Sequence, residues 1–111
     1  MEANILQDNL EVLTSGVIIA NKETKTRIVL EKEFEIHIVF EDNTKDEISI
    51  NNLKGNVGVE LKLKGFNNSL GTSTLRPLPI AKRKNKKVFI SFCVHAINDT
   101  KLVTYNLLGE V

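Results

Sequence analysis

The densest group of residues with a common chemistry is a basic run in the last third of the chain. Five cations occupy six positions: Lys82, Arg83, Lys84, Lys86 and Lys87. Clustered cations bind phosphates by displacing condensed counterions, and they also bind acidic protein surfaces. Nucleic-acid modules usually interleave such runs with aromatic side chains that stack on bases, and the nearest aromatic here is Phe89. The run therefore predicts either an anion-binding site or, as the favoured interpretation, a solvated hairpin loop whose charges oppose edge aggregation.

A segment rich in glycine and hydroxyl groups, residues 65–74, is the second candidate. Backbone N–H groups of such segments can cradle phosphate, but the Gly-x-x-x-x-Gly-Lys-Ser/Thr spacing is missing and no helical pattern follows. Long irregular segments of compact domains are nevertheless often functional. We interpret this one as a connector, anchored by Phe66 and Leu70, in preference to a binding loop.

Carboxylates gather around one predicted turn, at Glu41, Asp42, Asp46 and Glu47. Calcium prefers oxygen ligands of this kind, but its characteristic loop pattern is absent. A cation, Lys45, also stands in the middle of the group. We therefore predict no metal site here.

The evidence that Cys93 is a catalytic nucleophile is equally weak. Cys93 and His95 share a strand face but lie about 7 Å apart along it, and His37 shares its phase with Glu35. A buried structural cysteine and surface histidines are far commoner than a Cys–His nucleophilic pair. No Ser/His/Asp pattern or metal-ligand spacing occurs either. We predict no catalytic residue, no cofactor and no enzymatic activity.

Period-two alternation of apolar residues predicts the elements that carry these groups. Successive side chains of a strand point to opposite faces, so each alternating series lines one face of a sheet. The three longest series are Ile28, Leu30, Phe34, Ile36, Ile38 and Phe40; Val57, Val59, Leu61 and Leu63; and Val88, Ile90, Phe92, Val94 and Ala96. No segment shows a convincing helical repeat with caps, so the predicted class is all-β.

Turn residues place the strand boundaries in the first half. We expect one or two strands over residues 10–20, with Gly16 marking a bulge or bend. The series over residues 27–41 is longer than a usual strand, so it predicts either one long bent strand or two strands broken near residues 31–33. The Asp-Asn-Thr-Lys sequence at 42–45 predicts a hairpin between Phe34–Glu41 and the next strand.

In the second half, Pro77 and Pro79 exclude a central strand from the segment that they interrupt, because proline cannot donate a ladder hydrogen bond. Residues 88–96 are the clearest strand, and a further strand closes the domain. Seven or eight strands at this spacing are typical of sandwiches.

Length and composition favour one domain, residues 1–111. The predicted fold is a single antiparallel β-sandwich, immunoglobulin-like in general layout, with a distorted β-barrel as the alternative. The likeness is architectural, because one cysteine and no tryptophan cannot form the Cys…Trp…Cys signature. The predicted core contains Ile36, Ile38, Phe40, Val59, Leu61, Ile90, Phe92 and Val94.

The net charge of +1 is unevenly distributed. Residues 1–60 hold twelve acids and six bases, whereas residues 61–111 hold nine bases and two acids. Two arrangements follow from this asymmetry. The halves form opposite sides of the sandwich and create a dipole, or acidic and basic strands pair within each sheet. We expect the second.

The single cysteine, Cys93, excludes an intrachain disulfide, and the first residues lack the basic start and apolar stretch of a signal peptide. No run reaches the roughly 18 apolar residues that span a bilayer. We therefore expect a cytoplasmic protein without membrane contact. Twelve lysines against three arginines, with frequent Asn and Ile, suggest an AT-rich genome, as in a bacterium or its phage.

The expected function is a non-enzymatic module that binds another protein or a second copy of itself. No catalytic constellation is visible, whereas the edge strands of a sandwich are available for pairing. The alternative is an anion- or nucleic-acid-binding module that uses the basic run 82–87.

Overall fold

Nine strands form in the part of the chain that the computed structural model describes, which is residues 9–20, 23–41, 48–52, 58–64, 72–74, 76–98 and 100–111. They are β1 (Leu10–Ala20), β2 (Glu23–Glu31), β3 (Phe34–Glu41), β4 (Ile48–Asn52), β5 (Gly58–Lys64), β6 (Thr72–Ser73), β7 (Leu78–Arg83), β8 (Lys86–Ile97) and β9 (Thr100–Glu110). The series over residues 27–41 is two strands, separated by a turn at Lys32 and Glu33.

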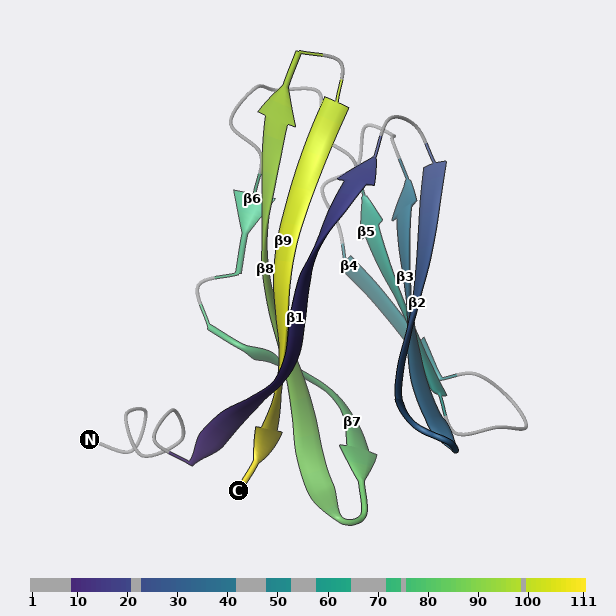
Figure 1. The fold of residues 1–111 in the computed structure, drawn as a ribbon, viewed down its shortest axis with the longest axis vertical. Coiled ribbons are helices and arrows are strands. Elements are labelled where there is room, and N and C mark those ends of the chain that lie inside the picture. Colours follow the sequence, from purple (N-terminus) through teal and green to yellow (C-terminus); the bar gives the residue numbers. More distant parts are fainter. Residues whose placement is uncertain are drawn as a thin grey trace.

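The strands build two sheets that pack face to face (Figure 1). Sheet A has the order β1-β9-β8, and both β6 and β7 pair with the far side of β8. Sheet B has the order β2-β3-β5-β4. Every pair is antiparallel except β3 and β5, which are parallel. The sheets do not close into a barrel, so the sandwich prediction is confirmed and the barrel alternative is wrong.

The core lies between the inner faces of the two sheets and is built mainly from Ile, Leu and Val. All eight predicted core residues are at most 5% exposed. Ile18 of β1 and both Val103 and Leu107 of β9 complete it from the other edge of sheet A. The period-two pattern therefore identified the inner faces of β3, β5 and β8 correctly.

The predicted hairpin between β3 and β4 is wrong. β5 lies between these strands, because it pairs with β3 on one side and with β4 on the other. The turn residues 42–45 themselves lie outside the described residues, as do 53–57 and 65–71. β7 is an edge strand that pairs only with β8 in the described part of sheet A, as the prolines required, and its register shifts between Pro79 and Ala81.

The expected pairing of acidic with basic strands is also wrong for most of the molecule. Sheet B is formed by the segments from residues 23 to 64, and sheet A by β1 together with the segments from residues 72 to 110. Only β1 crosses from the acidic half into the sheet of the basic half. The two halves of the sequence therefore largely occupy opposite layers of the sandwich.

Gly16 has a packing role instead of marking a bulge. The register of β1 shifts between Val12 and Thr14, so the irregularity lies before the glycine. Gly16 is the cross-strand partner of Tyr105, and a Cβ at position 16 would lie 2.6 Å from the Tyr105 hydroxyl oxygen. The phenol ring thus occupies the space of a side chain that Gly16 lacks.

Candidate functional site: the basic hairpin and the β1 edge

The basic run folds as a hairpin with a two-residue turn. Lys82 and Arg83 end β7, Lys86 and Lys87 begin β8, and Lys84 and Asn85 form the turn. The two turn residues have positive φ angles of 53° and 65°. Such left-handed pairs match the twist of the flanking strands, which is why tight hairpins use them. The five predicted cations are therefore gathered at one tip of the molecule (Figure 1).

Like charges face each other across this hairpin. Lys82 is the partner of Lys87, and Arg83 is the partner of Lys86. Side chains alternate along β8, and Val88 is buried in the core, so Lys86 shares the inner phase and Lys87 the outer one. Like charges directly opposite are destabilising. Each face of the hairpin tip thus carries one unfavourable cationic pair.

Glu31 of the neighbouring β2–β3 tip neutralises part of this charge. Its carboxylate oxygens lie 2.9 Å from Arg83 Nε and 3.2 Å from Lys84 Nζ. A hollow of about 480 Å³ between the two tips is lined by Lys32, Phe34 and Lys82 together with these residues. The acidic and basic halves of the sequence therefore meet across the sandwich, at the tips of two hairpins.

A second hollow, of about 310 Å³, lies on the other side of the basic hairpin, against the ends of β1 and β9. Glu11 and Glu110 line it together with Lys86 and Lys87. The backbone N–H of Lys87 donates a 2.6 Å hydrogen bond to Glu110 Oε1. Carboxylates thus flank the cations on both sides, and neither hollow is a purely basic pocket.

An exposed apolar surface lies along β1. Val12, Val17 and Ile19 are 60%, 59% and 65% exposed, whereas Ile18 and Ala20 are buried. The three exposed residues point away from the core, and two of them have the leucines Leu108 and Leu102 as β9 partners. Sequence reasoning missed this surface because it followed a single apolar phase. The available signal was the Val-Ile-Ile-Ala run at 17–20, which is apolar in both phases.

Beyond its bulge between Val12 and Thr14, this strand is also a sheet edge without the usual protections. β1 pairs only with β9 in the described part of the molecule, and Val12–Ala20 contains neither a charged residue nor a proline. The other edges carry the usual protections against strand pairing. β2 bears Lys25 and Arg27 on its outer face, β7 contains Pro79 and basic residues, and β4 has only five residues.

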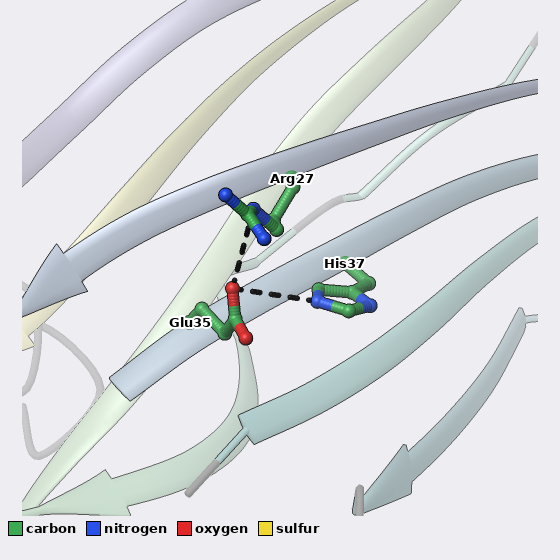
Figure 2. A network of polar contacts seen from close by, with 3 residues as sticks. All are labelled: Arg27, Glu35 and His37. Carbon is green, nitrogen blue, oxygen red and sulfur yellow. Dashed lines mark ion pairs between the residues drawn. The ribbon is translucent and has the colours of Figure 1, made fainter. Parts of the chain in front are cut away.

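The outer face of sheet B is polar by contrast. Figure 2 shows Arg27 of β2 beside Glu35 and His37 of β3. Glu35 Oε2 lies 3.4 Å from Arg27 Nε and 3.6 Å from His37 Nε2. Arg27 is largely exposed, and ion pairs in such positions contribute little to stability. Glu35 and His37 are half-buried, so this network is a partly solvated polar face.

The other candidate groups are dispersed. Cys93 is half-buried and His95 exposed, both in the outer phase of β8. The acids Asp42, Asp46 and Glu47 lie outside the described residues, and the described ones hold no group of three metal-ligating side chains. Of the segment 65–74, only 72–74 is described, and its end is tied to β8 because the Phe92 N–H donates to Thr74 Oγ1 at 3.1 Å. The described chain contains no helix of the length and apolarity needed to cross a membrane.

Comparison with known families adds one match. A model described as a domain of unknown function, DUF6864, matches residues 4–110. This range includes every described strand, and with them both the basic hairpin and the β1 edge. No curated protein and no solved structure matches the chain. The chain belongs to the DUF6864 family.

Proposed function

We propose that the chain is a non-enzymatic protein-interaction module that binds through the edge of β1. One observation carries this proposal: among the described residues, Thr14–Ala20 is an edge without charge, proline or bulge that also exposes two large apolar side chains, Val17 and Ile19. Clusters of exposed apolar residues commonly mark interaction sites. Covering each of these side chains contributes roughly 1 kcal/mol to binding.

The mode of binding is strand addition. An extended segment that pairs with β1 satisfies the free N–H and C=O groups of the edge, and this main-chain pairing supplies affinity. Its alternate side chains lie beside Val17 and Ile19 on the outer face, where apolar contacts supply further affinity. The protections on β2, β4 and β7 disfavour the same contact elsewhere.

A capture experiment with three baits tests this proposal. Wild-type protein, Val17→Lys and Val29→Lys are immobilised separately. A cell lysate is passed over each bait, and the proteins that each bait retains are identified. Val29 is a matched control, because it is 54% exposed on the outer face of the edge strand β2. We expect partners on the wild type and on Val29→Lys that are lost from Val17→Lys. The same partners on all three baits would contradict binding through β1.

Anion binding by the basic hairpin is the second candidate. It is favoured by the two like-charge pairs, Lys82 with Lys87 and Arg83 with Lys86, because a bound anion would relieve their repulsion. Glu31 already pairs with two of the five cations, and carboxylates line both neighbouring hollows. We therefore rank this function second, and we name no catalytic residue, metal or cofactor.

Three further properties stay predictions. The cytoplasm is the compartment that we propose, because a single cysteine excludes an intrachain disulfide. Two packed sheets support an immunoglobulin-like layout, although the parallel pair of β3 and β5 departs from a fully antiparallel one. A bacterial or phage origin rests on composition alone.

A further inference from the structure

We infer that the occupant of the β1 edge is a second copy of this chain, paired antiparallel through the two β1 strands with a two-fold axis near Val17. The inference rests on the proposed function, since it uses the same edge. It adds the partner, the direction of pairing and the residues that meet.

The composition of β1 is suited to pairing with itself. In a two-fold antiparallel pair, each β1 residue lies opposite a β1 residue of the second copy. A charged residue near the axis would therefore lie close to the same charge on the second copy. Val12–Ala20 contains no charge. With Val17 on the axis, Ile19 lies opposite Ser15 of the second copy and Ala20 lies opposite Thr14. Every pair that this register forms among residues 14–20 of the two copies is neutral.

The ends of the stretch carry opposite charges. Glu11 precedes it, and Lys101 of β9 is the cross-strand partner of Ala20 at its end. Both belong to the inner phase, as do Gly109, the partner of Glu11, and Ala20. In an antiparallel arrangement Glu11 lies at the end of the second copy that carries Lys101, three residues beyond Ala20, so the strand ends avoid the like-charge contact that a parallel pair would make.

The protection of the other edges makes the assembly close at two copies. An isologous contact uses the same surface of both subunits and leaves none of it free. β2, β4, β6 and β7 resist further pairing through charge, shortness or proline. The product is one sheet continuous through both copies of sheet A. Val17 and Ile19 of each copy then extend a single apolar strip on its outer face.

A strand of another protein is disfavoured, because residues 14–20 of β1 offer it neither a charge pattern nor one of the two hollows. Specific strand addition usually relies on pockets for alternate side chains or on charge patterns. Neither of the two hollows is lined by residues 14–20, and these residues carry no charge. The self-complementary pairing of residues 14–20 supplies specificity without such features.

Sedimentation analysis of the purified protein over a concentration series tests the inference. We expect a monomer–dimer equilibrium for the wild type and for Val29→Lys. Val17→Lys places two lysines at the axis and is expected to weaken the dimer by about tenfold or more. Circular dichroism should show the same fold for all three proteins, because both valines are exposed. A monomer at every concentration, or a dimer that Val17→Lys leaves unchanged, would overturn the inference.

Cross-linking checks the position of the axis independently. In a Cys93→Ser background, Val17→Cys and Val29→Cys each carry one thiol, because Cys93 is the only natural cysteine. A short bis-maleimide should link the Val17→Cys protein into dimers and leave the Val29→Cys protein monomeric. Equal yields at the two positions would show random collision and contradict the β1 pairing.

The two proposals fail in different ways. In one outcome the protein is strictly monomeric, and Val17→Lys still loses the partners that the wild-type bait captures. That outcome overturns self-pairing but retains the β1 edge as a binding site. A dimer that Val17→Lys leaves intact, together with unchanged captured partners, overturns both.

Discussion

The contact between Gly16 and Tyr105 shows what a single residue decides in this fold. Tyr105 is the only tyrosine of the chain, and its ring lies over the one β1 residue that has no side chain. The sequence indicated that Gly16 was special and suggested a bend. Its actual partner is distant in sequence and belongs to a strand that only the register identifies. Local patterns contain no information of that kind.

Gly16→Ala should destabilise the protein. The new Cβ would lie 2.6 Å from the Tyr105 hydroxyl oxygen and 2.9 Å from Cζ, so the ring must move. Overpacking of this kind costs about 1–3 kcal/mol, measured by urea unfolding followed by circular dichroism. In a Tyr105→Phe background the closest contact is gone, so the same change should cost less. An equal cost in both backgrounds would show that the hydroxyl is not the obstacle.

Tyr105 also makes the stability of the fold depend on pH in the alkaline range. Desolvation by burial raises the pKa of Tyr105 above its ordinary value of 10.0. Above pH 10 the unfolded chain loses this proton while the folded chain still holds it, so the free energy of unfolding falls as pH rises through this range. Below pH 10 both states are protonated and the residue adds no pH dependence.

Because the chain has one tyrosine and no tryptophan, tyrosinate absorbance reports this residue alone. Its midpoint should lie above pH 10.0 in the folded protein and return towards 10.0 in urea. Tyr105→Phe should lose less stability than the wild type above pH 10, which separates the effect from lysine titration. A folded midpoint at or below 10.0 would contradict burial of the hydroxyl.

At the scale of elements, the sequence predicted where strands lie better than which strands pair. Period-two alternation located β3, β5 and β8, because burial of one face acts on every second residue of a strand. The order β2-β3-β5-β4 was not predictable from turn residues, which report only on neighbours in the chain. β3 and β5 are the most apolar strands of sheet B, so they occupy its centre. The short polar β4 is left at the edge.

The turn of the basic hairpin should respond strongly to residue type. Lys84 and Asn85 both have positive φ, and glycine adopts this conformation without strain. Asn85→Gly should raise the free energy of unfolding by about 0.5 kcal/mol, because glycine is the preferred second residue of such two-residue turns. Asn85→Val should lower it by more than about 1 kcal/mol, because a branched side chain is strained there. Urea midpoints give both values, and similar midpoints for the two variants would contradict the left-handed turn.

At the scale of the whole molecule, the two halves of the sequence become the two layers of the sandwich. Most of the acidic half forms sheet B, and most of the basic half forms sheet A. Both arrangements were open from the sequence, because strand order decides between them and composition does not. The division leaves the basic hairpin facing Glu31 across the sandwich instead of beside it in a sheet. That carboxylate therefore offsets part of the positive charge that the tip presents to solvent.

Glu31→Gln tests whether the tip binds anions. The change frees Arg83 and Lys84 from their shared carboxylate, and it should cost less than about 1 kcal/mol of stability because these ion pairs are partly exposed. If the hairpin is an anion site, affinity for a single-stranded oligonucleotide should rise, and added salt should remove the gain as counterions compete. Fluorescence anisotropy at low and moderate salt measures both effects.

Glu35→Gln is the matched control, because it makes the same charge change at a carboxylate of similar exposure that pairs with Arg27 on the outer face of sheet B. A hairpin site predicts a larger gain for Glu31→Gln than for Glu35→Gln, and a loss when Lys84, Lys86 and Lys87 are replaced by serine. Equal gains would mean that net charge alone attracts the oligonucleotide. No binding at low salt would exclude nucleic acid as a ligand and leave the cations as protection for the β7 edge, which is the role that their pairing with Glu31 already favours.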